Sequence, residues 1–163
     1  MSADHIAIVE ADLSRNDHAD ATLRLLNAYA MDPMGDGKPL SETTRRDLIP
    51  ALRQHPTTMV FLAWRGTEPI GLAICFRGLS TFAARPLLNI HDYYVAPASR
   101  GTGVGRLLLG AVEQRAREIG CCKLTLEVQE NNRRARDVYR AAGFARSTYV
   151  PEAGGALFLS KVL

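Results

Sequence analysis

Residues 87–105 read LLNIHDYYVAPASRGTGVG, an apolar run typical of a β-strand that ends at a turn with three glycines. The glycines let the backbone turn its N–H groups inward without side-chain obstruction. Apolar residues at helical spacing follow the turn and stop near Gly120, at Val104, Leu107, Leu108, Ala111, Val112 and Ile119. The N-terminus of such a helix adds unsatisfied N–H groups and a partial positive charge of about 0.5 e. This arrangement favours a phosphate or pyrophosphate ligand, and a tight connection without a ligand is the alternative.

The order of the glycines distinguishes among phosphate-binding motifs. A dinucleotide fingerprint requires glycine at position 106, where this chain has arginine. A P-loop requires a Gly-Lys-Ser/Thr sequence, which this turn lacks. What remains is the pattern Arg-x-x-Gly-x-Gly after a strand, over Arg100–Gly105. It resembles the acyl-CoA-binding motif of the GNAT superfamily of N-acetyltransferases.

A second motif lies downstream, where residues 125–144 read TLEVQENNRRARDVYRAAGF. In GNAT enzymes a strand is followed by Asn, then by Ala three residues later, by Tyr seven residues later and by a terminal Gly-Phe. The residues of this chain that match that spacing are Asn132, Ala135, Tyr139, Gly143 and Phe144. Two motifs in the right order, separated by one helix and one strand, are far rarer by chance than either alone. The resemblance covers roughly residues 87–144, and the remaining elements agree with it.

Those remaining elements follow from periodicity and turn residues. Strands are predicted at residues 6–9, 58–64, 70–77, 87–95, 123–130, 144–150 and 156–163. Helices are predicted at residues 16–31, 41–52, 104–119 and 131–142, with Ser41 as an N-cap and Pro50 breaking or kinking the second helix. The order is an α/β plan with at least one parallel crossover. The resemblance implies a GNAT-like α/β fold with a mixed, mostly antiparallel sheet of six or seven strands and about four helices, in one acyl-CoA N-acyltransferase domain over residues 1–163.

The resemblance also assigns roles to individual residues. Tyr139 would lie beside the CoA sulfur and protonate the departing thiolate as general acid, and a core-packing tyrosine is the alternative. Asn132 would bind the pantetheine arm or the loop around it, and a helix N-cap is the alternative. Backbone N–H groups of the strand before the turn would pair with the pantetheine and polarise the acetyl carbonyl. The residues expected at the cofactor are Tyr94, Val95, Arg100, Gly101, Thr102, Gly103, Val104, Gly105, Arg106, Asn132 and Ala135.

An amine acceptor is mostly protonated at neutral pH and needs a base before it attacks a thioester. Glu127 is the first candidate, because the sequence Leu-Glu-Val around it resembles the ribosomal-protein N-terminal acetyltransferases, in which this Glu is the base. Asp92 is the second, since diamine acetyltransferases carry an acid near this point of the corresponding strand. His91 is the third, with an ordinary pKa of about 6.5. Strict alternation along a strand would let only one of His91 and Asp92 face the cleft.

Composition narrows the partners and the compartment. A formal net charge of +3 over 163 residues gives no strong case for nucleic acid or a membrane surface. The first residues show no basic start followed by an apolar run, so no signal peptide is expected. An odd count of three cysteines without Cys-x-x-Cys spacing favours reduced thiols and a cytoplasmic protein. The four histidines lack metal-ligand spacing, so no metal is expected.

The sequence therefore predicts an acetyltransferase that uses acetyl-CoA to acetylate a primary amine by direct attack in a ternary complex. The acceptor, a small-molecule amine or a protein N-terminus, is not identified; the family selects it with loops that correspond here to residues 31–39, 78–86 and 151–155. A non-catalytic acyl-CoA-binding module is the main alternative, and a nucleotide-binding protein of another fold is a weaker one. Homodimers are common in the superfamily, but no residue identifies an interface.

Overall fold

The computed structural model describes residues 5–148 and 150–163, and the described part contains one five-stranded sheet. In the order of the sheet, the strands are β1 (Ile6–Glu10), β2 (Thr58–Arg65), β3 (Glu68–Ser80), β4 (Arg85–Val95) and β5 (Leu124–Leu126). Neighbouring strands are antiparallel except β4 and β5, which are parallel. The predicted mixed, mostly antiparallel sheet is confirmed, with five strands in the described residues instead of six or seven.

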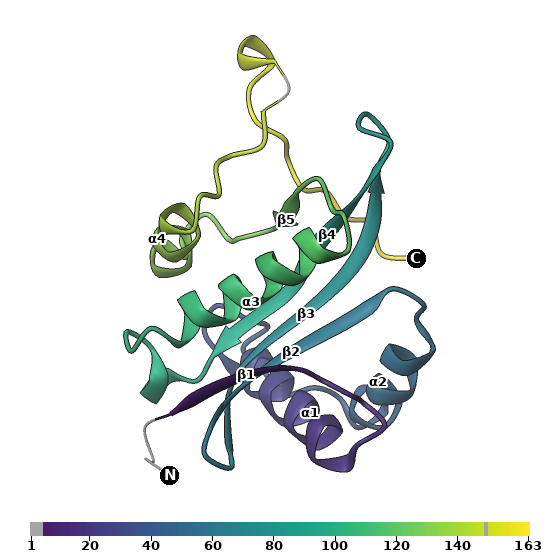
Figure 1. Ribbon diagram of the computed structural model, residues 1–163, viewed down its shortest axis with the longest axis vertical. Helices are drawn as coiled ribbons and strands as arrows, with labels where there is room; N and C mark the ends of the chain where they lie inside the picture. Colours follow the sequence, from purple (N-terminus) through teal and green to yellow (C-terminus); the bar gives the residue numbers. More distant parts are fainter. Residues whose placement is uncertain (1–4, 149) are drawn as a thin grey trace. The chain divides into compact units, whose positions relative to one another are not determined.

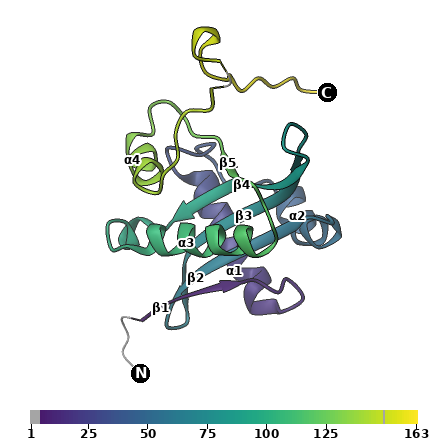
Figure 2. The ribbon, with the colours of Figure 1, turned by 45° about the horizontal axis from the view of Figure 1, so that its top comes forward.

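Helices cover both faces of the sheet because its central strands are apolar on both sides. α1 (Asn16–Met31) and α2 (Glu42–Gln54) lie on one face, and α3 (Val104–Glu118) lies on the other (Figure 1, Figure 2). The core under α1 and α2 consists of Leu13, Ala21, Leu25, Leu52, Val60, Leu62, Leu72, Ile74 and Tyr94. On the opposite face Val104 packs against Ala63 and Ile70. The faces are named the α1 face and the α3 face below.

The helix boundaries follow local signals, with one exception. The Ser41 Oγ accepts a hydrogen bond from the Thr44 N–H at 3.0 Å, so the predicted N-cap of α2 is confirmed. Gly120, with φ of 75°, follows the last turn of α3 as expected. The expectation that Pro50 breaks α2 is wrong, since the helix continues past it to Gln54, two residues beyond the predicted end; a kink at Pro50 stays a prediction. Burial of Leu52 in the α1-face core offsets the backbone hydrogen bond that proline cannot donate.

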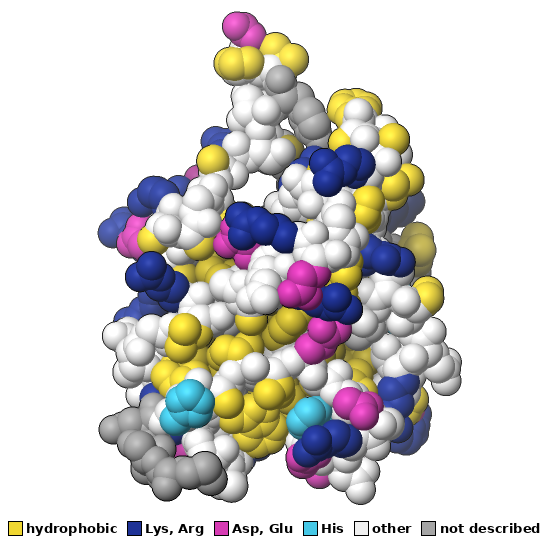
Figure 3. Space-filling view, viewed as in Figure 1, with side chains coloured by type: hydrophobic (Ala, Val, Ile, Leu, Met, Phe, Trp, Pro, Cys, Tyr) yellow, Lys and Arg dark blue, Asp and Glu magenta, His cyan; other side chains and the backbone are white. Residues whose placement is uncertain are grey.

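Charged side chains of both signs alternate along the visible surface of α3 (Figure 3). Arg115 is 3.0 Å from Glu10 on β1, and Arg117 is 2.5 Å from Glu113 within the helix. Much of the charge on this surface is therefore paired. Among residues 5–148 and 150–163, no helix has the length and apolar character needed to cross a bilayer.

The chain divides into two compact units, one that ends at Leu126 and one that begins at Glu127. The second unit contains α4 (Arg133–Ala141) and a short 3-10 helix, η2 (Pro151–Ala153). The prediction of one domain over residues 1–163 stays a prediction.

Two predicted strands of the second unit, residues 144–150 and 156–163, are not strands in the described part of the chain, and residue 149 lies outside it. The Ala156 N–H donates to the Ser147 carbonyl at 3.1 Å, but the described neighbours of this bond do not continue it as a ladder. The apolar residues that suggested the last strand are exposed, among them Leu157, Phe158 and Leu159. A short apolar run favours a strand, but it does not supply a neighbouring strand with which to pair.

Candidate active site

The glycine turn connects β4 to α3 through a short 3-10 helix, η1 (Pro97–Ser99). Gly101 and Gly103 have φ of 79° and 90°, a left-handed conformation that other residues adopt only with strain. The Thr102 Oγ1 donates to the Ser99 carbonyl at 2.7 Å and closes the turn. The first backbone N–H groups of α3, from Val104 onward, have no intrahelical acceptor and carry the positive end of the helix dipole. The turn therefore offers the anion-binding geometry that the sequence predicts.

Gly105, the third glycine of the motif, has an ordinary φ, but there is little room for a Cβ atom at its position. A Cβ atom on Gly105 would lie 2.6 Å from the hydroxyl oxygen of Tyr93, a distance at which one of them must move. Tyr93 belongs to β4, and its partner across the ladder is Ala73 on β3. Gly105 thus lets the start of α3 approach β4 closely, at the point where the N–H groups of the turn gather.

The side chain of Arg100 donates hydrogen bonds to groups outside the turn. Its Nε donates to the Val95 carbonyl at 2.9 Å, and its Nη2 donates to Asp32 Oδ2 at 2.6 Å. Its guanidinium carbon lies 5.6 Å from the centre of the Tyr94 ring. Arg106, by contrast, is exposed. The expectation that Arg100 contacts the cofactor stays a prediction, but its guanidinium already binds the C-terminal end of α1.

A β-bulge in β4 brings His91 and Asp92 to the same face of the sheet. Asp92 is the ladder partner of Ile74, while the next partner of β3, Cys75, is paired with Ile90, so His91 has no ladder partner. Ile74 belongs to the α1-face core. The His91 ring lies 5.4 Å from that of Phe76, which packs against the same core. The expectation that only one of the two residues can face the cleft is wrong, because a bulge breaks strict alternation.

The same bulge accounts for the short β5. The parallel ladder between β4 and β5 runs only from Leu88 to Ile90, and the bulge begins directly after it. The predicted strand over residues 123–130 therefore ends at Leu126. Within the described residues, the edge of β4 that pairs with β5 has no strand partner from His91 to Val95. The gap that the family resemblance implies at Tyr94 and Val95 stays a prediction.

Asp92 lies in an apolar, aromatic environment on the α1 face. Burial raises the pKa of Asp92 above its ordinary value, and the nearby His91 opposes part of that effect. Burial, with the charges of Asp92 and Asp32, raises the pKa of the Tyr29 hydroxyl. The Tyr29 and Tyr94 rings are 5.9 Å apart, so the last turn of α1 packs against β4 on this face. A carboxylate whose charged form is disfavoured is suited to take up a proton.

The other candidate catalytic residues belong to the second unit. Glu127 is exposed and follows the end of β5, so the predicted strand alternation does not orient it. Tyr139 is buried in the second turn of α4, with its ring 5.9 Å from that of Phe144. The Asn132 Oδ1 accepts from the Ala135 N–H at 3.2 Å, so Asn132 is the N-cap of α4. The pantetheine role of Asn132 and Ala135 stays a prediction, as do the roles of Glu127 and Tyr139.

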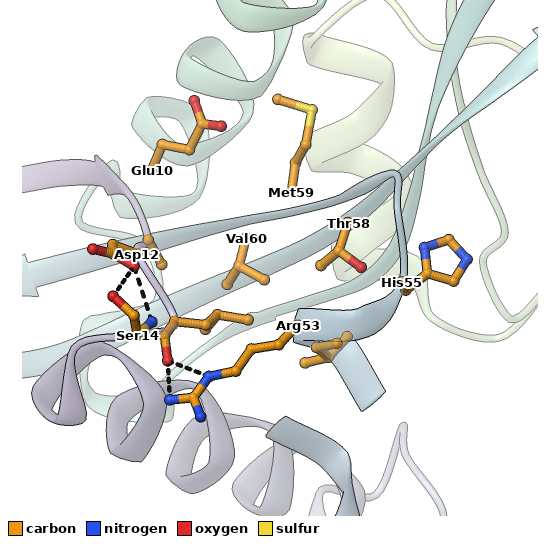
Figure 4. Close-up of a pocket in the computed structure, with 11 residues that line it drawn as sticks. Glu10, Asp12, Ser14, Arg53, His55, Thr58, Met59 and Val60 are labelled. Atoms are coloured by element: carbon orange, nitrogen blue, oxygen red, sulfur yellow. Dashed lines mark hydrogen bonds between the residues drawn. The ribbon is translucent and has the colours of Figure 1, made fainter. Parts of the chain in front are cut away.

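A separate cavity of about 320 Å³ lies between the end of β1, the start of β2 and the end of α2 (Figure 4). Two of its polar side chains are already engaged: Asp12 accepts from the Ser14 N–H and hydroxyl, and Arg53 donates to the Leu13 carbonyl. None of the predicted site residues lines it. We therefore place the candidate active site at the glycine turn and the α1 face of β4, and not in this cavity.

Sequence reasoning missed Tyr29 and Tyr93 as parts of this site. Tyr29 follows Leu25 by four residues on the buried face of α1, a spacing that was visible. Tyr93 is adjacent to the predicted Tyr94, but only the tertiary structure shows that its hydroxyl meets Gly105. Asp32 lies in the loop over residues 31–39, and nothing local in the sequence connects it with Arg100.

Known proteins share this fold and these motifs. The sequence model of the Acetyltransferase (GNAT) family matches residues 22–144, which include the glycine turn, Asp92 and Tyr139. The chain therefore belongs to this family. A crystal structure described as a probable acetyltransferase superposes with a TM-score of 0.78 at 24% sequence identity, over 96% of this chain and 99% of that chain. At this identity the superposition shows the shared fold.

Two curated relatives have named acceptors. The chain is 35% identical over 79 residues to thialysine N-epsilon-acetyltransferase of Bos taurus, covering 48% of this chain and 46% of that protein. It is 43% identical over 70 residues to streptothricin acetyltransferase of Streptomyces lavendulae, covering 43% of this chain and 37% of that protein. The matches thus span less than half of the length of either relative.

Proposed function

We propose that the protein transfers the acetyl group of acetyl-CoA to a primary amine, by direct attack of the amine in a ternary complex. We further propose that residues 1–163 act as one acyltransferase domain. The observation that carries the proposal is the glycine turn at the N-terminus of α3, with the acceptor side of β4 beginning a few residues before it. Membership of the Acetyltransferase (GNAT) family supports acetyl transfer in general.

The residues of the turn fit a pyrophosphate group. Gly101 and Gly103 adopt the left-handed conformation that such a turn needs, and Gly105 lets the N-terminus of α3 lie close against Tyr93 of β4. Acetyl-CoA would supply a thioester whose carbonyl carbon is the electrophile. The edge of β4 beyond its ladder with β5, up to Tyr94 and Val95, is proposed to hold the pantetheine arm and to donate to the acetyl oxygen. Donors aimed at a developing oxyanion lower barriers by about 3–4 kcal/mol elsewhere.

Asp92 is proposed as the general base that takes a proton from the bound ammonium group. Its support is burial on the α1 face, which raises its pKa above the ordinary value. A carboxylate with a raised pKa binds a proton more tightly and is a better general base at neutral pH. Glu127 was the first choice from the sequence, but it is exposed and outside any strand. Tyr139 is proposed as the general acid for the thiolate, on the resemblance of its motif and its burial on α4.

The acceptor is proposed to be a small cationic amine. The relatives are named for thialysine and streptothricin acetylation, and they support this class in preference to a protein N-terminus. Tyr29 lies close enough to Asp92 for the charge of that carboxyl group to raise the pKa of the Tyr29 hydroxyl. Together the two side chains suit an ammonium group, since aromatic faces and a carboxylate both attract cations.

Thermal unfolding with acetyl-CoA tests the proposal, with CoA, NAD and ATP as controls. A ligand at about 100 times its Kd stabilises the folded state by about 2.7 kcal/mol, so we expect the midpoint to rise by several degrees with either CoA form. Thiol release in the presence of a panel of amines then separates an enzyme from a binding module. No shift with either CoA form would contradict the proposal, and a shift without turnover of any amine would favour the non-catalytic module.

A further inference from the structure

Asp32, at the C-terminal cap of α1, is a junction between three segments. Its Oδ1 accepts from the Met34 N–H at 2.9 Å, and its backbone carbonyl accepts from the Gly35 N–H at 2.8 Å. Its Oδ2 accepts from Arg100 Nη2 at 2.6 Å, across 68 positions of sequence. One side chain therefore joins the end of α1, the loop that follows it and the first residue of the glycine turn.

The loop over residues 32–40 is attached to α1 at both ends. At its far end the Leu40 N–H donates to Asn27 Oδ1 on α1 at 3.0 Å. Near its start, a Cβ atom on Gly35 would lie 2.1 Å from the Tyr29 carbonyl oxygen, so the backbone of the loop lies directly against the last turn of α1. The pKa of the Tyr29 hydroxyl is raised in part by the charge of Asp92, so this loop packs against a residue of the proposed acceptor site.

The ion pair that holds this junction is largely removed from water. The side chain of Asp32 is 9% exposed and that of Arg100 is 27% exposed. Burial alone would raise the pKa of Asp32, but the hydrogen bonds from Arg100 and Met34, with the charge of Arg100, bring it below its ordinary value. A charged hydrogen bond of this kind is strong and geometrically specific, and removal of one partner leaves the other uncompensated.

We propose that Arg100 is a positioning residue that links acetyl-CoA binding at the glycine turn to the conformation of the acceptor loop over residues 32–40, through its ion pair with Asp32. Acetyl-CoA bound at the turn restrains Arg100, Arg100 restrains Asp32, and Asp32 holds the loop beside Tyr29, so the amine binds better after acetyl-CoA than before it. By linkage the amine then strengthens acetyl-CoA binding by the same factor. This inference rests on the proposed function, because it requires acetyl-CoA at the turn.

Hydrogen–deuterium exchange of the full chain, with and without acetyl-CoA, is the test. In the wild-type protein we expect acetyl-CoA to slow exchange at residues 103–106 and also in the loop, there by about 5-fold or more, the lower range of measured couplings. In Arg100→Met, the turn should still be protected by acetyl-CoA while the ligand-dependent protection of the loop disappears. Asp32→Asn should do the same, and Arg100→Lys, which keeps the charge, should retain part of the effect. Arg46→Gln, in the exposed pair with Asp47, is the matched control and should behave as wild type.

Acetyl-CoA affinity separates a positioning role from direct phosphate binding. Under the proposal, Arg100→Met and Asp32→Asn weaken acetyl-CoA binding by similar factors, and the double variant is no weaker than either. If Arg100 were a phosphate ligand, Arg100→Met would weaken binding far more than Asp32→Asn, which would overturn the proposal. Without ligand, both single variants should already exchange faster in the loop, provided that they remain folded by circular dichroism.

The remaining outcomes distinguish this inference from the proposed function. Wild-type protein that binds acetyl-CoA without any change in loop exchange would overturn the inference alone. Wild-type protein that does not bind acetyl-CoA would overturn both. Loop protection that persists unchanged in Arg100→Met and Asp32→Asn would show that another path connects the turn to the loop.

Discussion

At the scale of single residues, the close approach of Gly105 to Tyr93 predicts that an added side-chain atom at Gly105 destabilises the protein. Gly105→Ala should lower the free energy of unfolding by about 1–3 kcal/mol, the usual cost of inserting a methyl group where an atom must move, because its Cβ would lie 2.6 Å from the Tyr93 hydroxyl. Acetyl-CoA affinity should fall with it if the start of α3 shifts. Urea unfolding and calorimetric titration measure the two effects.

A second substitution at Tyr93 and an alanine elsewhere on α3 test whether this contact is the cause. Tyr93→Phe removes the hydroxyl, and the next contacts of the added Cβ are then at 3.8 Å, so the double variant should recover most of the stability. Gly110→Ala on the same helix meets no atom within 4 Å. It should stabilise the protein by up to about 1 kcal/mol through helix propensity. Equal effects of both alanines would show that the Tyr93 contact is not the cause.

Asp92 makes a residue-scale prediction about catalysis. Asp92→Asn keeps the shape of the side chain but removes the base, and loss of a general base typically costs about 100-fold to 10,000-fold in rate. We expect kcat for an amine identified by thiol release to fall within this range, with little change in acetyl-CoA affinity. Glu127→Gln is the comparison, and a larger loss of kcat there would return the role of base to Glu127.

At the scale of elements, the bulge in β4 determines which side chains of this strand lie on the α1 face. Strand periodicity predicted the boundaries of β4 within two residues, yet it placed His91 and Asp92 on opposite faces. The extra residue at His91 puts both on the α1 face and ends the ladder to β5. No local residue pattern reports a bulge of this kind, because it arises from the pairing register of two strands.

The N-cap of α4 gives an element-scale prediction. Asn132 offers its Oδ1 to the Ala135 N–H, which leaves its amide N–H₂ for the predicted contact with pantetheine. Asn132→Asp retains a good cap but loses that donor, so it should weaken acetyl-CoA binding while leaving the thermal midpoint nearly unchanged. Asn132→Ala should lower both stability, by about 1 kcal/mol, and affinity.

Tyr139→Phe on the same helix is compared with the two Asn132 variants. It should lower turnover and leave acetyl-CoA affinity unchanged, since the hydroxyl is proposed to act only on the departing thiolate. Acetyl-CoA affinity that is equal to wild type in Asn132→Asp would assign Asn132 to the cap alone.

At the scale of the whole molecule, the raised pKa of Asp92 makes stability depend on pH. The folded state holds the proton of Asp92 more tightly than the unfolded state, where the pKa is about 3.9. The contribution of Asp92 to the stability of the wild-type protein is therefore lost as pH rises from about 4 through the folded-state pKa, a loss that Asp92→Asn cannot show. The variant should be at least as stable as wild type at pH 7, and its advantage should vanish near pH 3, as measured by urea unfolding across pH. A variant less stable than wild type at pH 7 would mean that the charge of Asp92 is paired in the folded state.

The sequence by itself determined the order of helices and strands in the first 126 residues, the glycine turn and the family, because periodicity, caps and glycine conformations are local properties. It also led to two strands after residue 143 that the described chain does not form, since apolar residues alone cannot provide a pairing partner. The tertiary structure decided which acid is enclosed beside α1, what fills the space at Gly105 and that Arg100 binds Asp32. Each of these depends on strand register or on contacts between distant segments, which no single stretch of sequence specifies.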